Sequence, residues 1–554
     1  MMTRQLLLLV AAVLLTAGPL RAADKAVPPE PPGLKPGRVD LTVDTEKSVG
    51  ICHRFWTVNV FTSQHQFAQE RCGFLLKRDK PFMKYANCVR MLGGREDKRN
   101  AWYRGVDAQG RVKTDFADLV RYLKALLNMG YTPRLVLDNV PTAMSTIEQM
   151  NKYGNTNPPD DWGLWRQYIT ALMKALVDAF GLDRVATWRI RVGTEPDLNP
   201  SHWVGTKEQY LAHYDHTVAA VTSVLPEAII GPGNILNPAN AKTRKRPGCY
   251  WGLDIIDHCA KGTNHVTGKT GTRMRHFSIS FYGGVGKPLT LEASLRKARE
   301  RLDRYPPYRE LALEVQEFGI LHDEHRRRLW GNDITEWGAS WYAAVAGIVY
   351  RNGVAEVYEW SQSTGGLPHP RTHVTRMLEM MADGKRLDVT ASGKAAGRAG
   401  AIACEKGGKV YVLLYSHHPL RAPKGGNTLA LTIRGARIAK GPTWSLNEWT
   451  IDRDHGVWAH RMYRDCAEAG LKPLPKSPLY GGQPYRRFGE AWRGLFARNR
   501  AAYAKLAVFP QTAKDKPVPS RDGSIALTFD MPGHGVRLVE LSATGDVKKD
   551  GHAK

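Results

Sequence analysis

The sequence predicts an α/β fold in which a (β/α)8 TIM barrel precedes an appended C-terminal β-sandwich domain. Between about residues 50 and 380, eight short apolar segments of strand character alternate with segments of helical period, which predicts a parallel sheet connected through helices. After about residue 385, strand-like runs between glycine-rich turns replace this alternation, as is typical of a sandwich. A chain of 554 residues is also too long for one core.

The barrel prediction rests on eight strands and six helices. Phe116, Leu119 and Leu123 fall on one face of the first helix, and Gly130 and Gly181 end the first two helices. Strands are expected at residues 53–60, 85–91, 134–138, 188–194, 229–232, 276–282, 311–318 and 356–360. Helices are expected at 114–128, 162–180, 209–225, 251–260, 291–303 and 335–352. An open, doubly wound sheet would show the same alternation, but no Gly-x-Gly-x-x-Gly or P-loop motif follows the first strand.

The composition divides the chain into five predicted regions. Residues 1–23 are predicted to be a signal peptide, 24–49 an extended lead-in whose strand joins the sandwich, and 50–384 the barrel. Residues 385–545 are predicted to form the sandwich with a helical insertion at 485–506, followed by a polar tail at 546–554. Strands of the sandwich are expected at 409–415, 428–433, 442–451, 525–529 and 535–541.

The first residues have the pattern of a secretory signal. Arg4 precedes an apolar run over residues 6–17 that only Thr16 interrupts, and cleavage is expected near Ala22 or Ala23. The run is too short to span a bilayer, and no later apolar stretch reaches spanning length. The sequence therefore predicts a secreted or periplasmic protein with no membrane span.

The cysteine content makes a structural metal site unexpected. Seven cysteines are few for this length and odd in number, and no two are spaced as Cys-x-x-Cys. The run His322-Asp323-Glu324-His325 could suggest a metal, yet it has no spaced partner and continues into arginines, which favours a solvated loop. No metal and no cofactor are predicted.

The charge favours an anionic partner. Lys and Arg number 79 against 53 Asp and Glu, a formal net charge of +26. Such an excess suits nucleic acid, a membrane surface or an acidic polysaccharide, and export argues against nucleic acid. Basic clusters at residues 242–246 and 326–328 follow the fifth and seventh strands, where barrel loops surround the catalytic mouth, and a third lies at 486–487. The hypothesis is an acidic or sulfated glycan; a solvated basic surface without a specific partner is the alternative.

The fourth strand places a carboxylate at the mouth of the predicted barrel. Trp188, Ile190 and Val192 alternate with polar residues, and Pro196 stops the strand directly after Glu195. With the apolar side chains packed outward, Glu195 points inward together with Arg189 and Arg191. The plain alternative is a loop acid that caps the next helix.

A second carboxylate at the same mouth suggests glycosidic chemistry. Cleavage of a glycosidic bond uses one carboxylic acid to protonate the leaving oxygen and a second group that attacks or activates water. Glu195 and Glu317 end the fourth and seventh predicted strands, so both reach the same face of the barrel.

These residues carry a family resemblance. Thr194-Glu195-Pro196-Asp197 resembles the Asn-Glu-Pro acid/base motif of retaining β/α-barrel glycosidases, and Gln316-Glu317-Phe318-Gly319 resembles their strand-seven nucleophile motif. Together with residues 55–58, 279–282 and 449–455, the chain is similar to glycoside hydrolase family 39, which holds β-xylosidases and α-L-iduronidases. The resemblance implies a barrel with a sandwich, a carbohydrate substrate, and no metal or organic cofactor. It also implies roles for four residues: Glu195 as acid/base, Glu317 as nucleophile, Arg90 as the cation that keeps the nucleophile ionised, and Trp360 as a platform for a sugar ring.

The substrate-binding positions depart from the family pattern. Thr194 stands where the family has Asn, Gly193 where a Trp is usual, and Arg191 where relatives have an acid. Tyr282 stands in place of the strand-six His. The subsite for the cleaved sugar is therefore altered, and the identity of the sugar stays open.

Three functions are compared on this basis. The first is an exported retaining glycosidase that uses Glu195 and Glu317; the second is a catalytically silent glycan-binding barrel; the third is a polysaccharide lyase. Glu336 also lies in a motif that resembles the strand-seven nucleophile, but Thr335 as N-cap with Glu336 in the first turn of a helix is the ordinary explanation. No Gly-x-Ser-x-Gly motif indicates a serine hydrolase.

Overall fold

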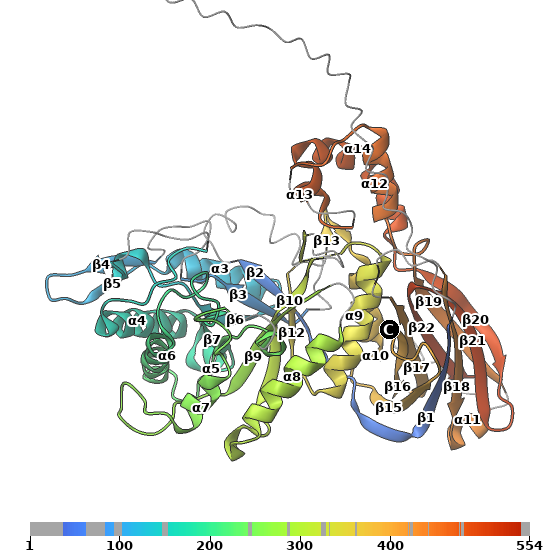
Figure 1. Ribbon diagram of the computed structural model, residues 1–554, viewed down its shortest axis with the longest axis horizontal. Coiled ribbons are helices and arrows are strands. Elements are labelled where there is room, and N and C mark those ends of the chain that lie inside the picture. Colours follow the sequence, from blue (N-terminus) through green and yellow to red (C-terminus); the bar gives the residue numbers. More distant parts are fainter. Residues whose placement is uncertain are drawn as a thin grey trace, which may run out of the picture.

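The computed structural model describes most of the chain, in two lobes that lie side by side (Figure 1). The described residues are 37–61, 83–92, 102–146, 153–241, 246–284, 288–322, 328–331, 333–360, 363–418, 420, 425–440, 443–475, 477 and 481–544. The first lobe, coloured blue to yellow, holds the barrel, and the second, mostly orange to red but with the blue N-terminal strand, holds the C-terminal sheet.

Eight parallel strands form the barrel. In order around it they are β2 (Trp56–Phe61), β3 (Tyr85–Val89), β6 (Thr132–Leu137), β7 (Arg189–Thr194), β8 (Ile229–Asn234), β9 (His276–Gly284), β10 (Ala312–His322) and β12 (Val357–Glu359). β12 pairs with β2, and a parallel bridge between Ile235 and Ile279 joins β8 to β9 and closes the ring. The predicted barrel is confirmed, and the doubly wound alternative is wrong because such a sheet has two open edges.

In the described part of the barrel, seven helices accompany these strands up to α9, and their ends follow the sequence signals. Asp161 caps α4 by accepting the backbone N–H groups of Gly163 and Leu164, and Gly181, with a φ of 84°, ends it. Thr206 and Gln209 form a complete capping box at the start of α6. The helices are α3 (Ala117–Asn128), α4 (Trp162–Phe180), α5 (Leu182–Ala186), α6 (Lys207–Thr222), α7 (Asp254–Lys261), α8 (Leu289–Leu302) and α9 (Glu336–Arg351).

The barrel interior below the mouth is charged. Arg134 lies 2.9 Å from Glu356, and Arg189 lies 3.4 Å from Glu356 and also pairs with Glu314. Directly before β7, Trp188 is buried against Phe180 of α4. The predicted parity of β7 is therefore confirmed, with arginines inside and apolar side chains toward the helices.

The second lobe is one nine-stranded sheet that curls over its own core. The strand order is β20-β19-β22-β17-β16-β15-β1-β18-β21. Val39 of β1, Leu431 of β18, Trp444 of β19 and Leu541 of β22 belong to one buried cluster, so both halves of the sheet enclose it. The strands are β1 (Gly37–Ile51), β15 (Lys385–Ser392), β16 (Ala399–Lys406), β17 (Lys409–His417), β18 (Gly426–Arg434), β19 (Thr443–Ile451), β20 (Gln511–Pro519), β21 (Ser524–Pro532) and β22 (His534–Ala543).

Three strands of this lobe were not predicted. In β15 and β20 a single side chain is fully buried, Leu387 and Val518 respectively, so neither sequence shows an apolar alternation. β16 is rich in small residues. The predicted helical insertion corresponds to α13 (Pro484–Phe488) and α14 (Glu490–Leu506), which pack near α12 (Ala459–Glu468) above the sheet in Figure 1.

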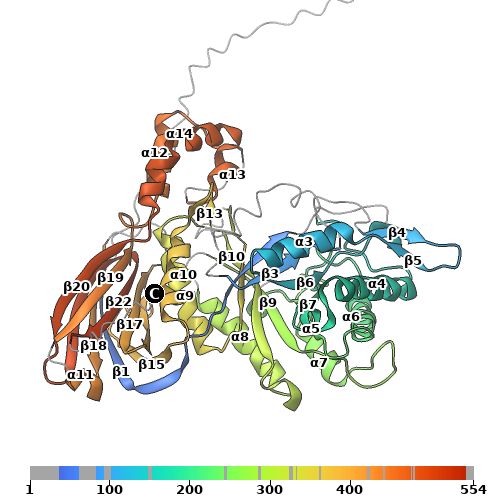
Figure 2. The ribbon, with the colours of Figure 1, turned by 180° about the vertical axis from the view of Figure 1, so that it is seen from behind.

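Helix α9 joins the two lobes. It packs against α8 and α10 (Pro370–Met381) on the barrel side and against β17 and β22 of the second lobe, as the view from behind also shows (Figure 2). Every residue from Trp337 to Tyr350 is buried. A helix that is buried all round indicates one continuous core across the two lobes.

Among the described residues, no helix has the length and apolarity needed to cross a membrane. The six cysteines in this part of the chain all have free thiols.

Candidate active site

Glu195 lies in the loop at the carboxyl end of β7, in a left-handed backbone conformation. Its φ is 42°, its side chain is buried, and its backbone N–H donates to the carbonyl of Asn234 at 3.0 Å. Gly193, with a φ of 78°, bends the strand just before it. A tryptophan would be strained in that conformation, which explains the glycine at this position.

Glu317 points into the same mouth from β10. Its carboxylate accepts a hydrogen bond of 2.7 Å from the Tyr282 hydroxyl on β9. The Trp360 indole N–H donates in turn to the Tyr282 oxygen at 2.6 Å. The three residues therefore form a chain of donors that ends on the carboxylate.

Arg191 connects the two strands that carry the glutamates. Its guanidinium donates to Gln316 on β10 at 2.8 Å and to the Thr194 hydroxyl at 2.9 Å. Thr194 donates to Asp138 at 2.6 Å, and Asp138 also pairs with Arg90 at 3.0 Å. The Thr194 hydroxyl therefore both accepts and donates a hydrogen bond within the protein.

The surroundings give the two glutamates different acidities. Burial raises the pKa of Glu195, the nearby charge of Glu317 raises it further, and the result is about 8. Burial also raises the pKa of Glu317, but Arg191 and Arg90 beside it pull that pKa back down. Both pKa values are raised, and the two arginines oppose the rise at Glu317, which suits Glu195 as the acid and Glu317 as the base.

Two polar groups approach the Glu195 carboxyl group from other elements. The Ser280 hydroxyl of β9 donates to it, and Ser280 accepts a bond of 2.6 Å from the Asn234 amide. His202 Nε2 lies 3.6 Å from Glu195 Oε2.

The structure brings all six predicted site residues into this network: Arg90, Thr194, Glu195, Tyr282, Glu317 and Trp360. Arg90 contacts Asp138 and His202 directly and acts on Glu317 through its charge. Sugar stacking on Trp360 stays a prediction.

Asp138, His202, Asn234 and Ser280 were not predicted as site residues, and Arg191 was predicted to point inward with Glu195 but was given no role in the site. Asp138 and Asn234 end or follow the third and fifth strands, so their position was a usable signal. His202 lies in a loop without such a signal, and only the folded chain shows its place.

Glu336, which lies in the second motif that resembles the nucleophile motif, is not part of this network. It occupies the first turn of α9, after Thr335, and contacts His460 of α12 at 2.6 Å. Residues 323–325 of the His-Asp-Glu-His run, and residues 242–245, 326 and 327 of the basic clusters, lie outside the described residues.

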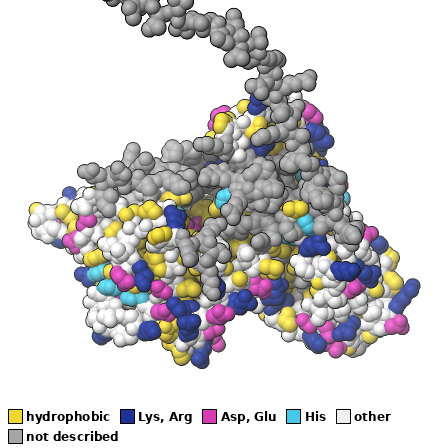
Figure 3. Space-filling model, in the orientation of Figure 1, with side chains coloured by type: hydrophobic (Ala, Val, Ile, Leu, Met, Phe, Trp, Pro, Cys, Tyr) yellow, Lys and Arg dark blue, Asp and Glu magenta, His cyan; other side chains and the backbone are white. Residues whose placement is uncertain are grey.

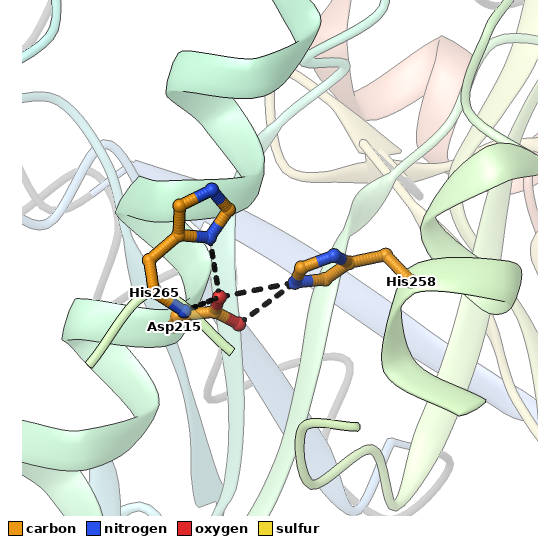
Figure 4. A group of neighbouring side chains, drawn as sticks. All are labelled: Asp215, His258 and His265. Atoms are coloured by element: carbon orange, nitrogen blue, oxygen red, sulfur yellow. Dashed lines mark hydrogen bonds and ion pairs between the residues drawn. The ribbon is translucent and has the colours of Figure 1, made fainter. Parts of the chain in front are cut away.

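A second polar cluster lies outside the barrel mouth, between α6 and α7 (Figure 4). Asp215 accepts from His258 Nε2 at 3.0 Å, from His265 Nδ1 at 2.7 Å and from Thr272 at 2.6 Å. Burial acts to raise the pKa of Asp215, but these hydrogen bonds outweigh it and lower that pKa. The donors saturate the carboxylate, so the cluster is explained as a clamp between the helices, and a cation would have to displace these bonds.

Comparison with known proteins agrees with the fold. Residues 39–299 match the family model for glycosyl hydrolases family 39. Over this segment, which is just under half of the sequence, the chain is similar to glycoside hydrolase family 39. The matched segment contains Glu195, and Glu317 lies beyond it.

Curated relatives in this comparison are glycosidases. An alpha-1,4-L-rhamnosidase of Formosa agariphila is 24% identical over 295 residues, which is 50% of this chain and 57% of the relative. A beta-xylosidase of Caldicellulosiruptor saccharolyticus is 27% identical over 226 residues, 40% of this chain and 43% of the relative. The chain thus spans about half the length of these relatives.

Solved structures share the fold across both lobes. A bacterial orthologue of human α-L-iduronidase superposes with a TM-score of 0.67 at 15% identity, covering 93% of this chain and 85% of the other. A monomeric beta-xylosidase from Caulobacter crescentus CB15 gives a TM-score of 0.65 at 16% identity, covering 91% and 99%. A barrel with an appended sandwich is therefore common to all three.

Proposed function

We propose that the protein is an exported retaining glycoside hydrolase that cleaves an oligosaccharide or polysaccharide by double displacement. The observation that carries the proposal is the pair of buried glutamates on strands four and seven, with the pKa of Glu195 at about 8 and the charge of Glu317 favoured by Arg191 and Arg90. The match of residues 39–299 to the model for glycosyl hydrolases family 39 supports the same chemistry.

In the first step, Glu195 donates its proton to the glycosidic oxygen while a Glu317 carboxylate oxygen attacks the anomeric carbon. The bond between that carbon and the leaving oxygen breaks, and a glycosyl ester on Glu317 forms. The Tyr282 hydroxyl, which donates to Glu317, orients the attacking carboxylate.

In the second step, Glu195 is a carboxylate and accepts a proton from water. The water oxygen attacks the anomeric carbon, the ester bond to Glu317 breaks, and both side chains return to their starting protonation. Two inversions give net retention of configuration.

The test is a screen of aryl glycosides and glycan digests, with the anomer first released recorded by proton NMR. Turnover with retention supports the proposal, and the two carboxyl groups should then lie roughly 5–5.5 Å apart in a crystal structure. An inverted product, or a separation of roughly 9 Å, contradicts double displacement. Binding without turnover would indicate the silent glycan-binding protein. That alternative is favoured by the Thr194 hydroxyl, whose hydrogen bonds are made within the protein. Unsaturated products would indicate a lyase.

Export is part of the proposal because of the apolar run in residues 1–23, which lie outside the described residues. Cell fractionation, with N-terminal sequencing of the mature protein, tests it: export predicts a mature N-terminus close after Ala22 or Ala23.

A further inference from the structure

A second chain of polar contacts reaches Glu195 in addition to the contact with Ser280. Arg90 Nη2 lies 3.1 Å from His202 Nδ1, and the other ring nitrogen of His202 lies 3.6 Å from Glu195 Oε2. The His202 side chain is only 5% exposed. The chain of groups therefore runs from Arg90 through a buried imidazole to the proposed acid/base.

The contact with Arg90 decides which nitrogen of His202 carries the proton. A guanidinium has donors only, so His202 Nδ1 must accept, and the ring proton then lies on Nε2. A doubly protonated ring would set a second N–H against the guanidinium. His202 is therefore neutral, with its Nε2–H group facing Glu195.

The imidazole is fixed from several sides. The Tyr153 ring lies against it with centroids 4.2 Å apart, and the same tyrosine lies beneath the Arg90 guanidinium at 5.4 Å. Asp138 holds Arg90 through both its backbone N–H, at 2.8 Å, and its side chain, at 3.0 Å. These contacts anchor the pair to the ends of β3 and β6.

We propose that His202 is a positioning residue for the acid/base: its Nε2–H donates to the Glu195 carboxylate that forms when the proton passes to the leaving oxygen. The inference rests on the proposed function. At 3.6 Å the contact is longer than a hydrogen bond, and catalytic contacts of this kind tighten when substrate binds. The titratable and charged groups that face Glu195 are Glu317, Asp197, Arg90, His202 and Tyr282.

The main test is the pH dependence of kcat/KM in His202→Phe, which keeps a ring on Tyr153 but removes both nitrogens. Loss of the donor should raise the pKa of Glu195. The fall of kcat/KM at high pH, the basic limb of the profile, should therefore move up by about one pH unit. For aryl glycosides with poor leaving groups kcat/KM should fall about tenfold, while substrates with good leaving groups, which need little acid assistance, should change less than about twofold.

Two further variants separate positioning from a structural role. His202→Gln retains an N–H donor and should recover most of the lost activity. His216→Phe is the matched control, because His216 stacks on Trp162 at 5.2 Å on α6, outside the barrel, and should leave the profile unchanged. Equal losses with good and poor leaving groups and an unmoved basic limb would overturn the inference.

Two measurements do not depend on turnover. In the unaltered protein, ¹⁵N NMR of the imidazoles should show His202 protonated at Nε2 alone; a proton on Nδ1 would overturn the inference. A ¹³C titration of labelled glutamate, assigned with Glu195→Gln, should show a higher pKa for Glu195 in His202→Phe. If this shift occurs while no glycoside is cleaved, the proposed function fails and the positioning contact stands; turnover without the shift removes the positioning contact alone.

Discussion

At the scale of single residues, the first prediction concerns the nucleophile. Glu317→Gln removes the attacking oxygen and should lower kcat/KM by at least about a thousandfold. Glu336→Gln should lower it less than about twofold, because Glu336 contacts His460 away from the barrel mouth. Rates on an aryl glycoside, with circular dichroism to confirm folding, give the comparison. A larger loss of activity in Glu336→Gln than in Glu317→Gln would mean that Glu317 is not the nucleophile.

The acidities of Glu195 and Glu317 make the second prediction. Activity needs Glu195 protonated and Glu317 ionised, so kcat/KM should fall as the pH rises through about 8, where Glu195 loses its proton. On the acid side, burial raises the pKa of Glu317, so activity should already decline at a pH above 4.5, the ordinary value for a glutamate.

A substrate with a good leaving group is the control for this profile. Its departure does not need the Glu195 proton, so the basic limb should flatten in a plot of kcat/KM against pH. A basic limb that begins below pH 6 for both substrates would contradict the environment described for Glu195.

At the scale of secondary-structure elements, the charged interior ties β6, β7 and β12 together. Glu356→Gln keeps the side-chain volume but leaves the buried Arg134 without the carboxylate it pairs with, while Arg189, whose side chain is 20% exposed, keeps Glu314. Breaking a buried pair in this way should lower the free energy of unfolding by about 3–5 kcal/mol. Urea denaturation measures the loss.

The matched control lies on the surface of α3. Asp118 pairs with Arg121 at 2.7 Å, and both side chains are exposed, so Asp118→Asn should cost less than about 1 kcal/mol. Equal effects of the two variants would mean that the interior pairs add little to the barrel's stability.

At the scale of the whole molecule, the formal charge of +26 motivates a proposal about the substrate. We propose that an acidic or sulfated glycan binds more tightly than a neutral one of the same length. On the face shown in Figure 3, Lys and Arg side chains lie over both lobes and are interspersed with Asp and Glu. The proposal therefore depends on the basic segments 242–246 and 326–328, most of which lie outside the described residues.

Salt dependence measures this preference. As the Debye length shrinks from about 30 Å to about 8 Å, affinity for the acidic glycan should fall, while affinity for the neutral glycan should stay nearly constant. Calorimetry with matched oligosaccharides at low and physiological ionic strength gives both curves. Equal affinities at low salt would remove the proposal and leave a solvated basic surface.

The sequence by itself determined the barrel and the two glutamates. All eight barrel strands and six of the outer helices were predicted near their observed positions, because each carries its own periodic pattern of buried side chains, whereas α5 and α10 were not predicted. Glu195 and Glu317 followed from strand order, since the ends of parallel strands meet at one face of a barrel. Strands β15 and β20 were missed because they bury few side chains and have no such pattern.

Only the tertiary structure decided the chemistry around those glutamates. Arg191 was treated as a departure until the fold placed it beside Glu317, and His202 had no strand to mark its position. Arg90 and His202 are 112 residues apart in the sequence, and both lie outside regular elements. Their contact depends on how distant loops meet in the fold, and no periodic pattern in the sequence indicates it. The pKa values of the site are set by burial and by charges from separate strands, which exist only once the barrel has closed.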